Sequence, residues 1–149
     1  MKELARNKRA YFDYQILEEI EAGIELLGFE TKATKSGKIN LAGSYARIIN
    51  NQVWLVGADI APYQPNNTPK DYDPERTRRL LVTSKEVGYL TGKMNEAGLT
   101  VVPLRAYIKG RLVKVSLGLV RSKKKQDKRE TIKKRDIDKE IRRSLKLKI

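Results

Sequence analysis

The chain of 149 residues contains no cysteine and no histidine. Without cysteine it has no disulfide, no thiol nucleophile and no thiolate metal site. Without histidine it lacks the Ser–His catalytic pair and the imidazole ligands of most zinc sites. An enzyme built from this chain would have to use carboxylates, lysine or tyrosine. We therefore expect no catalytic activity, no cofactor and no metal site.

Long apolar runs are absent as well. No stretch approaches the roughly 20 apolar residues that a membrane-spanning helix needs, and the basic segment Met1–Lys8 is not followed by the apolar run of a secretion signal. The sequence also lacks a glycine-rich loop ending in Lys-Ser or Lys-Thr, which would indicate a nucleotide phosphate site. These absences favour a protein that does not enter a membrane.

Positive charge is plentiful and unevenly distributed. The whole chain has 32 basic and 18 acidic residues and a net charge of +14. Residues 121–149 hold 14 of the basic and 5 of the acidic residues, a net charge of +9, which leaves +5 for residues 1–120. A pI near 10.0 favours a polyanionic partner, by default a nucleic acid. We expect one folded domain, residues 1–120, followed by a basic tail, residues 121–149.

The tail has a narrow apolar stripe. Ile137, Ile141, Leu145 and Ile149 recur every four residues, which places them along one side of a helix. The stripe is too thin to bury a core, so we expect the isolated tail to be frayed or disordered and a polyanion to order it. The alternative is a solvated tail that only aids solubility.

The residue pattern of the domain indicates a mainly β fold. It predicts a flexible start over 1–9, a strand over 11–28 with a bulge or bend at Ala22–Gly23, and helical turns over 30–36. A hairpin over 44–60 that turns at Asn50–Asn51 and a loop over 61–73 should follow. The chain should continue with a helix over 83–98 that begins with a Thr83–Glu86 capping box, and with a hairpin over 100–120 that turns at Lys109–Gly110. In the helix, Gly88 and Gly92 should allow close packing against the sheet. About six strands with one clear helix inserted predict a small antiparallel barrel, for which the oligonucleotide-binding barrel is the nearest standard architecture.

Three arginines precede an apolar strand, namely Arg76, Arg78 and Arg79. Guanidinium groups in such a cluster suit contact with phosphate. The alternative is a charged surface on which they pair with the nearby acids Asp71, Asp73 and Glu75. Lys114 and Arg105 are expected on the outer face of the last hairpin.

Carboxylates gather at Glu18, Glu19 and Glu21. In a strand, Glu19 and Glu21 share a face and could in principle hold magnesium. Charge runs usually face water, so a solvated strand face is the favoured interpretation.

A series of short segments resembles the SsrA-binding protein family, also called small protein B, whose members are partners of transfer-messenger RNA in bacteria. The segments follow one another along nearly the whole chain: Asn-Lys-Arg-Ala at 7–10, Tyr-Phe at 11–12, Glu-Ala-Gly-Ile at 21–24, Leu-Leu-Gly-Phe-Glu at 26–30, Gly-Ser-Tyr-Ala at 43–46, Asp-Pro-Glu-Arg-Thr-Arg at 73–78, Arg-Leu-Leu-Val at 79–82, Gly-Leu-Thr-Val-Val-Pro-Leu at 98–104, Lys-Val-Ser-Leu-Gly at 114–118 and Asp-Lys-Arg-Glu-x-Ile-Lys at 127–133.

The resemblance implies a closed six-stranded antiparallel barrel of the oligonucleotide-binding type, with about three flanking helices and a basic C-terminal tail. It also implies a cytoplasmic, monomeric RNA-binding protein. It would hold the tRNA-like part of transfer-messenger RNA and escort it to stalled ribosomes. The partners implied are transfer-messenger RNA and the ribosomal decoding centre with its 16S rRNA, and indirectly alanyl-tRNA synthetase and elongation factor Tu. The tail would enter the empty decoding site and message channel in place of codon–anticodon pairing.

The resemblance also implies which residues contact RNA. On the domain these are Asn7, Lys8, Arg9, Glu21 and the segment Arg78–Leu81, which overlaps the arginine cluster already described, to which the residue pattern also assigns Arg76. In the tail they are Lys123, Lys124, Lys125, Asp127, Lys128, Arg129, Lys133, Lys134, Arg135, Ile137 and Ile141. Gln126 departs from the family, which often has His or an aromatic residue there.

Two other functions would produce a similar charge pattern. One is a structural ribosomal protein with a basic extension, which would co-purify with ribosomes that are not stalled. The other is a magnesium-dependent nuclease that uses Glu19 and Glu21.

Overall fold

The structure is a computed structural model that describes residues 2–123. The strands are β1 (Lys2–Arg6), β2 (Tyr14–Ile24), β3 (Ile39–Asn40), β4 (Tyr45–Ile49), β5 (Gln52–Val56), β6 (Asp59–Ile60), β7 (Arg78–Leu81), β8 (Leu99–Lys109) and β9 (Leu112–Ser122). The helices are α1 (Lys8–Asp13), α2 (Gly28–Lys35), the 3-10 helix η1 (Pro65–Asn67) and α3 (Ser84–Met94). A mainly β chain with three α-helices is therefore confirmed for the described residues.

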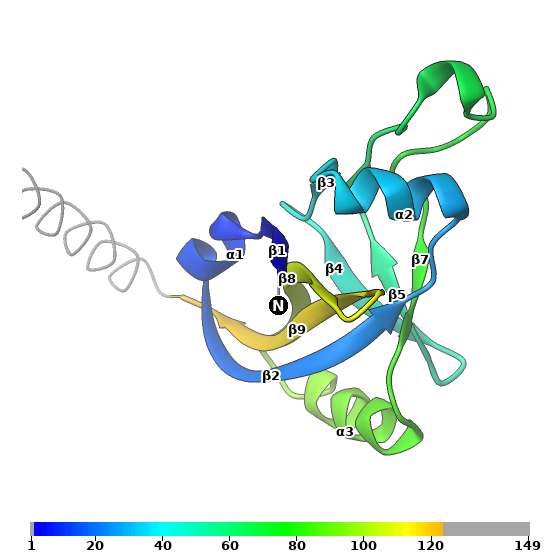
Figure 1. The fold of residues 1–149 in the computed structure, drawn as a ribbon. Coiled ribbons are helices and arrows are strands. Elements are labelled where there is room, and N and C mark those ends of the chain that lie inside the picture. Colours follow the sequence, from blue (N-terminus) through cyan, green and yellow to red (C-terminus); the bar gives the residue numbers. More distant parts are fainter. Residues whose placement is uncertain (1, 124–149) are drawn as a thin grey trace, which may run out of the picture.

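Seven of the strands form one antiparallel sheet in the order β1-β8-β9-β2-β7-β5-β4, and β3 pairs with β6 separately. The long strands β2, β8 and β9 cross the molecule together and curl, as Figure 1 shows. The curl brings β4 into contact with β8. In the described residues β1 and β4 remain the two edges of the sheet, so a closed six-stranded barrel is not confirmed.

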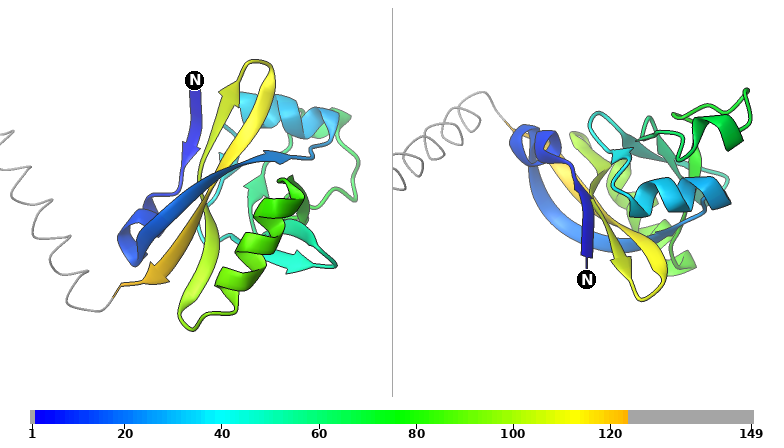
Figure 2. Two further views of the ribbon diagram at one scale, coloured as in Figure 1. Left: turned by 90° about the horizontal axis from the view of Figure 1, so that it is seen from below. Right: turned by 45° about the horizontal axis from the view of Figure 1, so that its top comes forward.

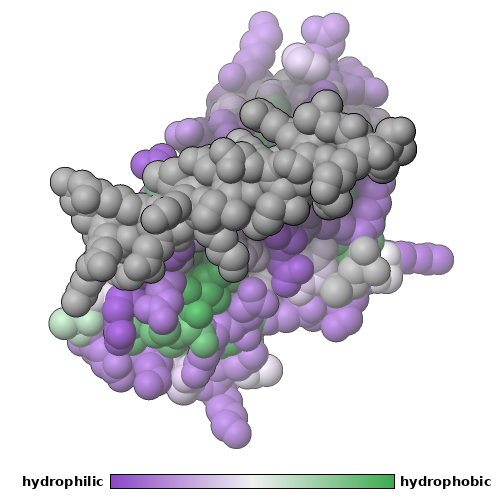
Figure 3. All heavy atoms as spheres, turned by 90° about the vertical axis from the view of Figure 1, so that its left-hand side faces the viewer, coloured by the Kyte–Doolittle hydropathy of each residue, from purple (hydrophilic) through white to green (hydrophobic). Residues whose placement is uncertain are grey.

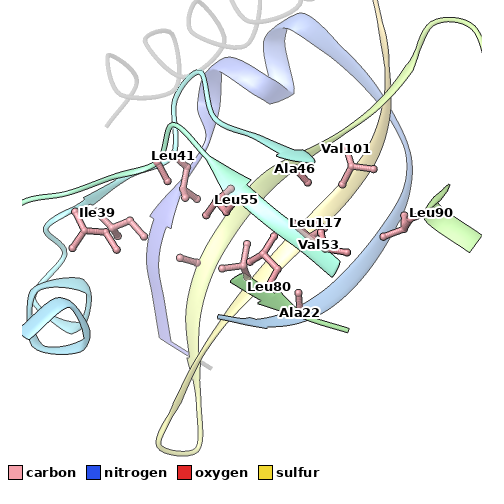
Figure 4. Packing of buried hydrophobic residues seen from close by; sticks show 14 of the residues in the cluster. Ala22, Ile39, Leu41, Ala46, Val53, Leu55, Leu80, Leu90, Val101 and Leu117 are labelled. Carbon is pink, nitrogen blue, oxygen red and sulfur yellow. The ribbon is translucent and has the colours of Figure 1, made fainter. Parts of the chain in front are cut away.

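The main core lies inside this curl. Alternate residues of each strand point inward, and Figure 4 shows their side chains meeting between the strands. The labelled residues of this cluster are all buried: Ala22, Ile39, Leu41, Ala46, Val53, Leu55, Leu80, Leu90, Val101 and Leu117. Burial of these apolar side chains is the main contribution that stabilises the fold.

A smaller core lies on the opposite face of the sheet, between α1 and the strands. It contains Ala10, Val102, Leu104 and Val120. Gly118 allows this packing, because a Cβ at that position would lie 2.7 Å from Leu104 Cδ1, closer than side chains can approach. This second core attaches α1 to the outer face of the sheet.

The three α-helices lie in different places around the sheet. In Figures 1 and 2, α2 and α3 lie on opposite sides of the molecule, and α1 lies beside the start of β2. Val87 and Leu90 of α3 join the main core. Within residues 2–123 no helix is long and apolar enough to cross a membrane.

The local signals in the sequence predicted several turns and caps correctly. Asn50 and Asn51 both have positive φ, at 51° and 60°, in the turn between β4 and β5. Thr83 and Glu86 form the expected reciprocal capping box of α3. Gly110 has φ of 62° in the turn between β8 and β9, which comprises Gly110–Arg111 and so lies one residue later than the expected Lys109–Gly110. Each of these features depends on adjacent residues only.

Four local expectations were wrong. The strand expected over 11–28 spans only Tyr14–Ile24, because Lys8–Asp13 form α1. Residues 2–9 are not a flexible end, because β1 pairs with β8 and Lys8 begins α1. The irregularity of β2 lies between Ile16 and Glu18 and not at Ala22–Gly23. A Cβ added at Gly88 or Gly92 would meet nothing within 4 Å, so neither glycine is needed for close packing.

Candidate nucleic-acid interface

The side chains with the clearest binding chemistry lie on the outer face of the main sheet, the face turned away from the main core. Ala22 is buried in that core, so its neighbours Glu21 and Gly23 point outward. Lys114 of β9 lies opposite Gly23, and Tyr107 of β8 lies opposite Lys114. The strand register thus places residues from three strands on one patch.

Glu21 is at the centre of this patch. The Tyr107 hydroxyl donates to Glu21 Oε2 at 2.5 Å, and Lys109 Nζ donates to Oε1 at 3.1 Å. Leu81 of β7 lies opposite Gly23 and is 44% exposed. We refer to Glu21, Leu81, Tyr107, Lys109 and Lys114 as the Glu21 cluster. It combines one carboxylate, two ammonium groups and an exposed apolar side chain.

Gly23 keeps the Glu21 cluster compact. A Cβ at this position would lie 3.3 Å from Leu81 Cβ and 3.8 Å from Lys114 Nζ. The absence of a side chain there lets Leu81 and Lys114 lie close together over the strand. An apolar and a cationic group are thereby available side by side.

The contacts of Glu21 change its acidity and that of its partner. The hydrogen bond from Tyr107, followed by that from Lys109, lowers the pKa of Glu21. Burial of Tyr107, together with its hydrogen bond to Glu21, raises the pKa of the phenol to about 12. At neutral pH the Glu21 carboxylate is therefore charged and Tyr107 remains a hydrogen-bond donor.

Further charges extend this face toward β1. Arg105 Nη2 lies 3.5 Å from Glu19 Oε2, and Arg6 pairs with Glu3 at 3.1 Å. Glu19 and Glu21 do share a face, as expected, but each pairs with a cation. The described residues contain no group of three or more potential metal-ligating side chains. The contacts of Glu19 and Glu21 therefore disfavour the magnesium-nuclease alternative.

Asn7, Lys8 and Arg9 separate into one buried and two exposed side chains. Asn7 is 3% exposed, and its amide nitrogen donates to the carbonyl oxygens of Leu41 and Pro103 at 3.2 and 2.8 Å. Its Oδ1 accepts from the Ala10 N–H and so caps α1. The contact of Asn7 with RNA stays a prediction, although the hydrogen-bonding groups of its side chain face the protein interior. Lys8 and Arg9 are exposed on α1.

Arg78 also differs from the expectation of a phosphate contact. Its side chain is fully buried, and Nε and Nη2 donate to Glu30 Oε2 at 2.8 and 2.6 Å. Its remaining donors meet three carbonyl oxygens at 2.9 to 3.0 Å, those of Ala58, Arg76 and Pro74. All five N–H donors of the guanidinium are thus used inside the protein. Arg78 is a structural residue.

Glu30 accepts from a second arginine as well. Arg76 donates to both of its carboxylate oxygens and is 31% exposed. Burial acts to raise the pKa of Glu30, but the hydrogen bonds from Arg76, from the Leu27 N–H and from Arg78 outweigh it and lower the pKa to about 2. The suggested pairing of the arginines with Asp71, Asp73 and Glu75 is also wrong, since their partners are Glu30 and Glu25.

Arg79 is the member of the arginine cluster that remains on the surface. It is 40% exposed, and its Nη1 lies 3.8 Å from Glu25 Oε1, beyond hydrogen-bond distance. Because side chains alternate along β7, Arg79 and Leu81 point to the outer face while Arg78 and Leu80 point inward. Arg79 therefore extends the outer face along β7.

The tail residues implied by the resemblance lie almost entirely outside the described residues. These are Lys124, Lys125, Asp127, Lys128, Arg129, Lys133, Lys134, Arg135, Ile137 and Ile141. Lys123 is described, and it contacts α1. Its N–H donates to the Asp13 carbonyl oxygen at 3.0 Å, and its Nζ donates to the Tyr11 carbonyl oxygen at 3.3 Å. These two hydrogen bonds fix the start of the tail beside the end of α1.

Sequence reasoning missed the role of Tyr107 and Lys109 and placed Lys114 only on the outer face. The hairpin itself was predicted, but its turn lies at Gly110–Arg111, one residue later than expected, and this register aligns Tyr107 with Lys114. The link to Glu21 depends on the pairing of β2 with β9, which joins residues about a hundred positions apart. No local pattern reveals that pairing.

The surface around these elements is largely hydrophilic. Figure 3 shows one face of the molecule, and in its coloured part hydrophilic side chains predominate around small apolar areas. Such a surface suits a charged partner more than an extended apolar one.

The comparisons with known proteins agree with this chemistry. The model of a family described as "SmpB protein" matches residues 4–147. The chain is 46% identical over 145 residues to an SsrA-binding protein of Gloeothece citriformis, covering 97% of this chain and 94% of the relative. It is 47% identical over 146 residues to an SsrA-binding protein of Chloroflexus aggregans, covering 98% and 92%.

A solved structure is similar as well. It is described as "tmRNA-SmpB: a journey to the center of the bacterial ribosome", and one of its chains is 41% identical with a TM-score of 0.68. The similarity covers 86% of this chain and 93% of that one.

Proposed function

Because the chain belongs to the SmpB protein family, we propose that it binds the tRNA-like part of transfer-messenger RNA and delivers this RNA to stalled ribosomes. The names of its relatives and the RNA–ribosome complex that contains its structural neighbour support this function. The observation that carries it is the Glu21 cluster on the outer face of the sheet. The protein would work in the cytoplasm as a monomer, as an RNA-binding protein without catalysis.

The Glu21 cluster offers complementary groups for a folded RNA. The ammonium groups of Lys109 and Lys114 suit phosphate oxygens. The Glu21 carboxylate can accept hydrogen bonds from exocyclic amino groups of bases, and Leu81 offers an apolar contact to a base or ribose. This mixture fits recognition of an irregular RNA surface better than uniform binding of any polyanion.

Lys8 and Arg9 on α1 form the second part of the proposed body interface. They are exposed, in contrast to Asn7, which holds α1 in place. Arg79 forms the third part and Arg76 contributes only its exposed portion, since it is engaged with Glu30. The curled sheet would act as a barrel of the oligonucleotide-binding type, with β4 beside β8.

The basic tail is proposed as a separate ribosomal contact. Its charge of +9 over residues 121–149 favours ribosomal RNA. We propose that it occupies the decoding site and message channel. Two linked binding sites raise the effective concentration of each at the other. Alanyl-tRNA synthetase and elongation factor Tu would be indirect partners through the RNA.

The function is tested by sequencing the RNA that co-purifies with the protein and by measuring binding to the tRNA-like domain. Transfer-messenger RNA should dominate the bound RNA. Lys109→Ala and Lys114→Ala should each reduce affinity and lower the log–log salt slope by about 0.7–0.9, if the scaling for nucleic-acid strands applies. Lys85→Ala, an exposed cation on α3, is the matched control and should change neither. Equal effects of all three variants would contradict a localised interface.

The tail is tested by ending the chain after Lys123. This variant should bind the tRNA-like domain with affinity close to that of the full chain and should fail to support peptide tagging on stalled ribosomes. Loss of RNA affinity as complete as the loss of tagging would contradict two separate sites. Stoichiometric co-purification with ribosomes that are not stalled would favour the structural ribosomal alternative.

A further inference from the structure

The outer face continues past the Glu21 cluster onto β7, β5 and β4, where it carries the only tryptophan of the chain, Trp54. Val53 and Leu55 are buried, so Trp54 between them points outward. The register places Trp54 opposite Arg79 on one side and opposite Arg47 on the other. An indole with an arginine on each neighbouring strand is therefore presented on the surface of the sheet.

Trp54 borders a hollow of about 560 Å³. The hollow is also lined by Leu27, which is 45% exposed, by Arg79, Arg76 and Thr77, and by Ile24, Glu25 and Leu26. Arg47 lies opposite Trp54 on β4, outside this lining. The volume of the hollow lies within the range of roughly 300–1,000 Å³ that ligand sites occupy. We refer to Trp54, Leu27, Arg47 and Arg79 as the Trp54 shelf. It has one aromatic surface, one aliphatic wall and two guanidinium groups.

The arginines of the shelf are available to a ligand. Arg79 lies beyond hydrogen-bond distance of Glu25, its only partner by charge among the described residues. Arg47 is exposed and forms no salt bridge within residues 2–123. Exposed aromatic and aliphatic groups alone would suit many ligands. The guanidinium groups of Arg47 and of Arg79, whose contact with Glu25 spans 3.8 Å, favour an anion attached to a flat ring. An unpaired nucleotide has both parts.

The shelf is also continuous with the proposed RNA interface. Leu81 of the Glu21 cluster is the next outward residue after Arg79 on β7. A strand of RNA that contacts Glu21, Lys114 and Leu81 can therefore extend directly onto Arg79 and Trp54. This continuity makes RNA the expected occupant, and not an acidic peptide.

We infer that the Trp54 shelf binds one unpaired base of the RNA, stacked on the indole, with its phosphate held by Arg79 and Arg47. This inference rests on the proposed function and adds a second contact to it. Stacking of a base on an aromatic side chain changes affinity by about 5- to 100-fold. The shelf recognises a flat ring and a phosphate, so it selects single-stranded over paired RNA without selecting a base.

The single tryptophan makes the inference directly measurable. Binding of the tRNA-like domain of transfer-messenger RNA to the full chain should quench the intrinsic tryptophan fluorescence, because a stacked base lies against Trp54. The quenching should follow the same titration curve as binding measured by filter retention. A fully paired RNA duplex of similar length is the control ligand and should leave the fluorescence nearly unchanged.

Substitutions separate stacking from folding. Trp54→Leu should lower affinity by about 5- to 100-fold, and Trp54→Phe, which keeps a flat ring, should recover most of it. Tyr89→Leu is the matched control, because Tyr89 is an aromatic residue 40% exposed on α3. It should bind RNA like the unaltered chain. Far-UV circular dichroism and thermal unfolding check that each variant is folded.

The two levels of the proposal fail in different ways. Absence of RNA binding by the unaltered chain would overturn the proposed function and the shelf with it. Binding without quenching, together with full affinity of Trp54→Leu, would overturn the Trp54 shelf alone and leave the Glu21 cluster as the interface.

Discussion

Two carboxylate–cation pairs of this protein are similar in geometry and opposite in environment. In the inner pair, Arg78 Nη2 lies 2.6 Å from Glu30 Oε2, and both side chains are fully buried. In the outer pair, Lys109 Nζ lies 3.1 Å from Glu21 Oε1, and the side chains are 58% and 37% exposed. The inner pair joins α2 to β7, and the outer pair joins β2 to β8.

The difference in burial decides what each pair can do. Breaking a buried pair leaves a charge without water or partner, which is costly, whereas exposed pairs contribute little to stability. Exposed groups can instead exchange their partner for a phosphate or a base. A cation near an acidic residue in sequence therefore indicates nothing about function until its exposure is known.

The largest expected effect comes from breaking the inner pair. Arg78→Ala should lower the free energy of unfolding by about 3–5 kcal/mol, because Glu30 Oε2 loses two donors and three buried carbonyl oxygens each lose one. Urea unfolding followed by circular dichroism measures the change. The neighbouring Arg79→Ala is the control and should unfold like the unaltered chain. Comparable losses for both variants would contradict the assignment of Arg78 as structural.

A change at the outer pair should affect RNA affinity more than the free energy of unfolding. Lys109→Ala should leave the free energy of unfolding nearly unchanged and weaken RNA binding, since Lys109 is exposed beside Glu21. Arg78→Lys, which retains the charge but cannot supply five donors, should instead lose stability. The pair of variants thus separates a residue that holds the fold from one that faces the RNA.

Acid should weaken the inner pair selectively. The pKa of Glu30 is about 2 in the folded protein against an ordinary 4.5, so the folded state favours the charged carboxylate. The corresponding stability is complete above pH 4.5 and is lost as the pH falls through about 2, a loss of about 3 kcal/mol. Urea unfolding at several pH values measures it. The stability difference between the unaltered chain and Glu30→Gln should shrink over this range, and a constant difference would contradict the shift.

A smaller effect is expected at Asn7, which the family resemblance had placed at the RNA. Asn7→Ala removes the α1 cap and the donors to the Leu41 and Pro103 carbonyl oxygens. We expect a loss of about 1–3 kcal/mol in unfolding free energy. Asn7→Asp retains the cap acceptor but not the two donors, so it should not restore stability. If Asn7→Ala unfolds normally and still loses RNA affinity, Asn7 belongs to the interface itself.

What could be predicted from the sequence depends on whether a feature involves neighbouring residues or joins distant segments. Features set by neighbouring residues were predicted correctly, such as the Asn50–Asn51 turn and the capping box of Thr83 and Glu86. The mainly β character followed from the alternation of apolar residues. The outward position of Lys114 followed from hairpin alternation alone.

Features that join distant segments could not be predicted. Arg78 was assigned to the surface because its partner Glu30 lies 48 positions earlier, and charge near Asp71 and Asp73 suggested nearer partners. Residues 2–9 seemed flexible because their order depends on pairing with β8 about a hundred positions later. The arrangement of the Glu21 cluster has the same origin, since three strands must pair before its members meet.

The smallest expected effect tests a part of the surface that neither pair uses. Gly88 and Gly92 are exposed on α3, and a Cβ at either would meet nothing within 4 Å. Gly88→Ala and Gly92→Ala should therefore each raise the free energy of unfolding by about 1 kcal/mol, because alanine loses less backbone entropy in a helix. Affinity for the tRNA-like RNA should stay unchanged, since Val87 and Leu90 of α3 pack on the main core and no residue of α3 belongs to the Glu21 cluster. Urea unfolding and RNA titration measure the two quantities, and a stabilised variant with weakened RNA binding would bring α3 into the interface.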